Sequence, residues 1–105
     1  MKNERTILKL ALKTPISNEV VNMLITQILN KKDHNFLLIN FGDHDFESIA
    51  VIKYCREQLE TIKQDLLAFE KIAMVHPPDY ENESEDNLKL RYFTSEQDAV
   101  NWLLR

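Results

Sequence analysis

The chain has 105 residues, a formal net charge of −4 and a single cysteine, Cys55. This length predicts one domain, residues 1–105, that buries about 65% of the surface its unfolded form exposes. The lone cysteine excludes an internal disulfide, and the acidic balance argues against nucleic acid as the main partner.

The amino-terminal residues are charged and do not form the apolar stretch of a secretory leader. The longest uninterrupted apolar run is four residues, whereas a membrane-spanning helix needs about 20. We therefore expect a cytoplasmic protein with no membrane span.

The first part of the chain predicts a strand followed by a helix. Residues 5–12 alternate between apolar and polar side chains, as in a half-covered strand that ends before Pro15. Ser17 is then placed to cap a helix, because the apolar residues from Val20 to Leu29 recur on one helical face.

A buried strand and a long helix are predicted next. Residues 36–41 are almost wholly apolar, as in a strand covered by helices on both faces. Asp43 or Asp45 can cap the following helix, whose apolar stripe extends over residues 46–69. The sequence leaves two alternatives open: one continuous helix, or a break near Thr61.

The last third of the chain predicts two more strands and a final helix. Residues 72–75 form a third buried strand that stops at His76, and the segment 79–87 carries five acids and no base, as in a solvated loop. Residues 88–93 alternate as a fourth strand. Thr94 is placed to open the terminal helix, with glutamine three residues on.

This order of elements, β-α-β-α-β-β-α, predicts an α/β domain. Strands that are separated by helices run mostly parallel, because each crossover returns the chain to the same end of the sheet. We therefore expect a mostly parallel four-stranded sheet flanked by helices.

Polar side chains follow the second and third strands, at the sheet edge where α/β domains bind ligands. If those strands are neighbours, His44 and His76 can converge with some of Asp43, Asp45 and Asp79. Such a set can bind a metal or act in hydrolysis, and it can equally be a polar turn, a helix cap and a strand stop. No metalloprotease-type spacing is present.

Three single residues have two interpretations each. Ser48, in the first turn of the second helix, either accepts a phosphate near the positive helix end or hydrogen-bonds locally. Cys55 lies on the apolar stripe and fits the core better than a nucleophile. Trp102 fits a helix packed on the core better than an exposed contact. Since one glycine cannot form a nucleotide-binding loop, we expect no cofactor and no enzymatic activity.

The carboxyl-terminal segments 69–75, 88–93 and 95–103 resemble the SpoIIAA-like proteins of the STAS group, the sulfate transporter and anti-sigma-factor antagonist domains. A buried strand, a loop, a strand ending in phenylalanine and a final helix with an Ala-x-x-Trp-Leu pattern carry the resemblance. The layout of the upstream elements is compatible with the same fold.

The resemblance implies a non-enzymatic regulatory or protein-interaction module whose partner is a kinase or another regulatory protein. Glu47 and Ser48 look like the acidic residue and phosphorylated serine of that group, although Ile49 and Ala50 replace a second hydroxyl residue and a glycine. The expected interaction edge comprises Asp43, His44, Asp45, Phe46, Glu47 and His76.

Two further expectations accompany this interpretation. Some SpoIIAA-like proteins resemble lipid-binding domains in architecture, so a carrier of an apolar ligand is the alternative function. We expect the protein to be a monomer or, through exposed aromatic residues, a weak homodimer.

Overall fold

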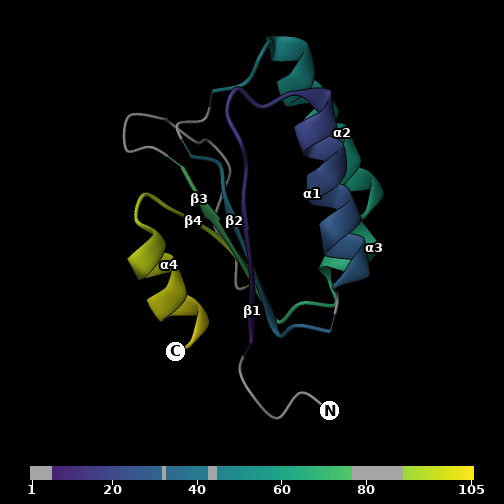
Figure 1. Ribbon diagram of the computed structural model, residues 1–105. Coiled ribbons are helices and arrows are strands. Elements are labelled where there is room, and N and C mark those ends of the chain that lie inside the picture. The colour runs from purple at the N-terminus through teal and green to yellow at the C-terminus, as the bar shows by residue number, and fades with distance from the viewer. Residues whose placement is uncertain (1–5, 32, 43–44, 77–88) are drawn as a thin grey trace.

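The computed structural model describes residues 6–31, 33–42, 45–76 and 89–105 (Figure 1). Its elements are β1 (Ile7–Ala11), α1 (Asn18–Asn30), β2 (Phe36–Asn40), α2 (Ile49–Thr61), α3 (Lys63–Leu66), β3 (Lys71–Val75), β4 (Leu90–Phe93) and α4 (Glu96–Leu103).

The four strands form one sheet in the order β1-β2-β3-β4, and every neighbouring pair is parallel. The register aligns Leu8, Leu37, Ile72 and Leu90 in a row across the sheet. The predicted four-stranded α/β sheet is therefore confirmed, and its described strands are parallel throughout.

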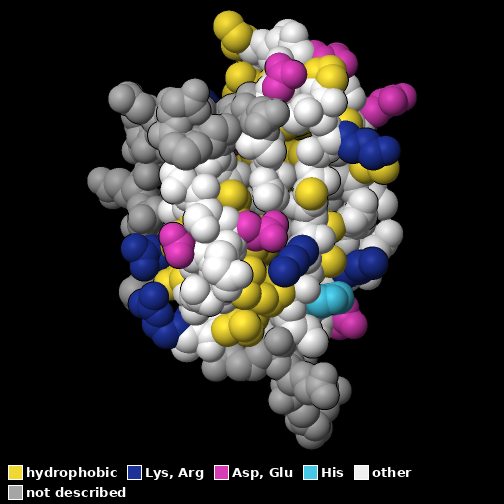
Figure 2. All heavy atoms as spheres, turned by 60° about the vertical axis from the view of Figure 1, so that its left-hand side comes forward, with side chains coloured by type: hydrophobic (Ala, Val, Ile, Leu, Met, Phe, Trp, Pro, Cys, Tyr) yellow, Lys and Arg dark blue, Asp and Glu magenta, His cyan; other side chains and the backbone are white. Residues whose placement is uncertain are grey.

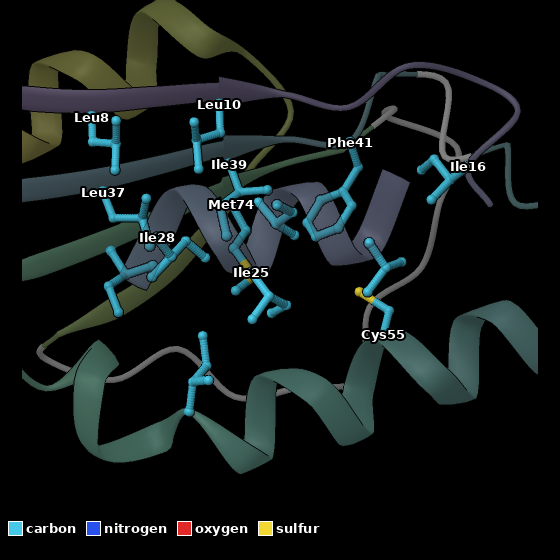
Figure 3. Packing of buried hydrophobic residues seen from close by; sticks show 14 of the residues in the cluster. Leu8, Leu10, Ile16, Ile25, Ile28, Leu37, Ile39, Phe41, Cys55 and Met74 are labelled. Atoms are coloured by element: carbon cyan, nitrogen blue, oxygen red, sulfur yellow. The ribbon is translucent and has the colours of Figure 1, made fainter. Parts of the chain in front are cut away.

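Helices cover both faces of this sheet (Figure 1). On one face, Leu8 and Leu10 of β1 and Leu37 and Ile39 of β2 point toward α1, which contributes Ile25 and Ile28, as Figure 3 shows. On the other face, Phe36 and Leu38 pack with Trp102 and Leu103 of α4. The apolar run of β2 is thus buried on both sides, as its composition predicts.

Ser17 is the N-cap of α1, as predicted, and its Oγ accepts a hydrogen bond from the Val20 amide at 3.3 Å. The long apolar stripe is broken into two helices, because α2 ends at Thr61 and α3 begins at Lys63. Of the two alternatives that the sequence left open, the break near Thr61 is the one found.

Two predicted helix starts are wrong. Neither Asp45 nor Phe46 begins α2, because Phe46 forms a parallel bridge with Ile16 that holds the chain extended up to the N-cap, Ser48. Asp43 lies outside the described residues.

The terminal helix also starts later than predicted. The carbonyl of Phe93 accepts a hydrogen bond from the His76 amide at 3.0 Å, which keeps the end of β4 extended. Ser95, and not Thr94, is therefore the N-cap of α4, and its Oγ accepts from the Asp98 amide at 3.4 Å.

Trp102 and Cys55 are both buried, as predicted. The centroid of the Trp102 ring lies 5.6 Å from that of the Phe93 ring and 5.0 Å from Lys71 Nζ.

In the lower half of the face turned forward in Figure 2, Lys and Arg side chains flank a group of hydrophobic side chains. In the described part of the chain, no helix is long and apolar enough to cross a membrane.

The core has a direct test on α1, where Ile28 is fully buried and Met23 is 59% exposed. We expect Ile28→Ala to lower the free energy of unfolding by about 2–5 kcal/mol, because it removes buried methyl groups and leaves a cavity. Met23→Ala on the same helix should change it by less than about 0.5 kcal/mol. Urea denaturation followed by circular dichroism measures both. Equal losses would contradict the described packing of α1.

Candidate functional site

The segments that follow β2 and β3 lie at the same end of the sheet, because these two strands are parallel neighbours. The Phe41 amide donates to the Val75 carbonyl oxygen at 2.9 Å, which ties the two strand ends together. Of the predicted edge residues, Asp45, Phe46, Glu47 and His76 are described, as is the predicted phosphorylation site Ser48, whereas Asp43, His44 and Asp79 lie outside the described residues.

Residues 45–47 are fixed against the loop that follows β1. The Ile16 amide donates to the Asp45 carbonyl oxygen at 2.7 Å, and the Glu47 amide donates to the Ile16 carbonyl oxygen at 3.0 Å. The half-buried Phe46 side chain packs against the core, with its ring 6.4 Å from that of Phe41. Phe46 therefore anchors this segment, while the exposed Asp45 and Glu47 face solvent.

His76 is buried at the end of β3, with its ring centroid 6.0 Å from that of Tyr92. Within the described residues, no three or more His, Cys, Asp or Glu side chains come together as a group that could hold a metal ion. The structure thus places His76 inside the fold, and the predicted convergence with His44 falls on an undescribed residue.

The strand order also bears on the predicted ligand edge. In doubly wound sheets, the ligand crevice forms where the strand order reverses and the crossing helices change faces. The described strands follow one another in sequence, and both α1 and α2 cover the same face. Among these four strands there is accordingly no switch point to open such a crevice.

Ser48 differs from the other two serines that cap helices. Ser17 and Ser95 both accept a capping hydrogen bond through their side chains, whereas Ser48 makes no such bond. Its backbone carbonyl oxygen accepts from the Val51 amide at 3.1 Å, so the helix starts there without using the hydroxyl. The Ser48 hydroxyl is thus exposed and uncommitted to the cap.

An exposed apolar residue follows immediately. Ile49 is 84% exposed, the highest value among the exposed large hydrophobic residues of the described chain. Together with Glu47, Ser48 and Ala50 it forms a wholly exposed segment, residues 47–50, which we call the α2 tip. In Figure 1 the first turn of α2 stands at the top of the view, beyond the end of the sheet.

Cys55 lies further along α2 and, unlike the residues of the α2 tip, is buried. Burial raises the pKa of its thiol to about 11, and the nearby Arg56 guanidinium only partly opposes this shift. The thiol therefore stays protonated at neutral pH and is a poor nucleophile.

The structure also contains a groove that the sequence did not predict. It has a volume of about 220 Å³ and lies between β1 and α1, lined by Lys9, Leu10, Ala11, Leu12, Lys13, Val20, Met23, Leu24 and Gln27. No sequence signal indicated it, because the groove depends on β1 lying at the edge of the sheet beside Met23, whose exposure only the structure shows.

Comparisons with protein-family models, with curated proteins and with solved structures found no match to this chain. The resemblance to the SpoIIAA-like proteins therefore rests on the sequence motifs alone. The structure adds a parallel α/β sheet with helices on both faces.

The contrast between the capping serines is measurable. Ser17→Ala and Ser95→Ala should each lower the free energy of unfolding by about 1 kcal/mol, because each removes the acceptor of a helix-capping bond. Ser48→Ala should lower it by less than about 0.5 kcal/mol, since its side chain makes no cap. Chemical denaturation of the three variants provides the test. A loss at Ser48 equal to that at Ser17 would show that its hydroxyl is committed to the helix.

Proposed function

We propose that this chain is a non-enzymatic regulatory module of the STAS type, which binds a protein partner through the α2 tip and is controlled by phosphorylation of Ser48. Two features of one exposed helix start carry the proposal. The Ser48 hydroxyl makes no capping hydrogen bond, and the neighbouring Ile49 side chain is nearly fully exposed.

Ile49 supplies the apolar contact in this proposal. On the same helix, Val51 and Cys55 are buried and hold α2 against the core, so Ile49 is not needed to anchor it. Burying an isoleucine side chain of this exposure in a partner contributes about 1.5–3 kcal/mol. In this proposal the exposed Ile49 side chain is the apolar anchor, and the polar Glu47 and Ser48 lie beside it.

Ser48 supplies the control. The first turns of α1 and α4 contain acidic residues that interact favourably with the positive helix end, namely Glu19 in α1 and Glu96 and Asp98 in α4. The first turn of α2 contains none. A phosphate on Ser48 would add about −1.5 to −2 charges at the positive end of the α2 dipole, next to the acidic side chain of Glu47. The added charge would lie directly next to Ile49, where it changes partner docking.

The alternative of an apolar-ligand carrier has less support. Small-molecule pockets have volumes of about 300–1,000 Å³ and enclose most of the ligand. The groove between β1 and α1 measures about 220 Å³, which suits a side chain better than a lipid. The protein-interaction module is therefore the function that these surfaces favour.

Affinity capture from native cells with variants of the α2 tip tests the proposal. Ile49→Glu should reduce recovery of the partner at least tenfold, because it replaces the apolar anchor with a charge. Ser48→Asp should change the amount of partner bound relative to Ser48→Ala, and phosphopeptide mapping should find phosphate on Ser48.

The matched control is Leu67→Glu, which places the same charge on another exposed apolar residue, at the far end of the α2–α3 pair. It should retain the partner. Identical partner lists and amounts for Ile49→Glu, Leu67→Glu and the unmodified chain would contradict docking at the α2 tip. Unmodified Ser48 would contradict its control by phosphate.

A further inference from the structure

β1 lies at one edge of the sheet and pairs only with β2 among the described strands. The Phe36 amide donates to the Thr6 carbonyl oxygen at 3.0 Å, and the Leu12 amide donates to the Asn40 carbonyl oxygen at 3.0 Å. Since parallel strands use alternate residues on each side, the even-numbered residues direct their backbone groups to β2. The amides and carbonyls of Ile7, Lys9 and Ala11 face away from the sheet, where a further strand would pair.

The groove lies beside this open edge. Its β1 wall is residues 9–13, and its α1 wall consists of Val20, Met23, Leu24 and Gln27, one face of the helix. Met23 is 59% exposed, although it lies among apolar neighbours. A strand added to β1 would therefore place every second side chain against an apolar wall.

The intervening side chains of such a strand would lie beside the exposed Lys9. Leu8 and Leu10 point to the α1 side, so Lys9 and Ala11 face the α4 side, where both are exposed. Lys9, at the centre of β1, therefore places a positive charge on the side to which these intervening side chains point, although the whole chain carries a net charge of −4. Acidic side chains at alternate positions of the incoming strand complement this charge.

The same lysine disfavours a second copy of this chain. Lys9 is the central residue of β1, so two β1 strands paired antiparallel about their centres would place Lys9 directly opposite Lys9. Like charges in that position are destabilising, and a lysine on an edge strand is a known device against self-pairing.

We propose that the open edge of β1 and its groove bind an extended segment of a protein partner as a fifth strand, with apolar side chains in the groove alternating with acidic side chains toward Lys9. This mode is β-strand addition, in which backbone hydrogen bonds provide affinity and the alternate side chains provide selectivity. The lining of the groove does not include the α2 tip, so an experiment can contradict this inference without contradicting the proposed function, and the reverse also holds.

The test uses the 105-residue chain and a synthetic nine-residue peptide that alternates valine with glutamate. Titration followed by ¹⁵N NMR should shift the amide signals of Ile7, Lys9, Ala11 and Met23 in a saturable way. Lys9→Glu should weaken binding by at least about fivefold, because an attractive cross-strand pair becomes a repulsive one. A peptide that alternates valine with lysine should then bind the Lys9→Glu variant better than the unmodified chain.

Two matched variants control for charge and for helix changes. Lys53→Glu makes the same charge reversal on an exposed residue of α2, and it should bind the glutamate peptide within about twofold of the unmodified chain. Met23→Glu should reduce binding, whereas Thr26→Glu, an exposed position of α1 outside the groove, should not.

The absence of saturable shifts at β1 would overturn the proposal. Equal weakening by Lys9→Glu and Lys53→Glu would reduce the effect to net charge and would overturn it as well. Shifts at β1 that depend on protein concentration without peptide would identify a second copy as the occupant and would equally contradict it.

Discussion

The burial of β2 on both faces is the constraint on which the rest of the structure depends. Phe36, Leu37, Leu38 and Ile39 are consecutive and each is at most 1% exposed, so neighbouring side chains on opposite faces must both be covered. One face takes α1 and α2, and the other takes α4. A strand with this composition is typical of the interior of a parallel sheet, and β2 lies between β1 and β3, which leaves β1 and β4 at the edges.

Two surfaces of the molecule have exposed features that do not contribute to the packing of this core. α2 is held by Val51 and Cys55, so the exposure of Ile49 and the free hydroxyl of Ser48 serve no purpose in packing. In β1, Leu8 and Leu10 are buried in the core, whereas Lys9 is exposed and one row of backbone groups faces away from β2. Both surfaces suit contact with another protein, the first through an apolar anchor beside a charge switch and the second through strand pairing.

The sequence predicted the elements and the sheet because their signals are local. The continuous apolar run of β2 and the stripe of α1 depend only on periodicity, and Ser17 caps its helix within three residues. The start of α2 was predicted wrongly because a distant contact decides it: the bridge between Ile16 and Phe46 keeps the chain extended past Asp45. The groove was missed for the same reason, since no local pattern states that β1 forms an edge beside Met23.

The central claim is that a protein partner docks on the α2 tip, and site-specific photo-crosslinking in native cells tests it most directly. A photoreactive amino acid at position 49 should yield one dominant cross-linked protein, because Ile49 would lie within the interface. The same group at position 67, also exposed, should yield little of that product. No cross-linked protein at position 49, or the same products at both positions, would contradict the account.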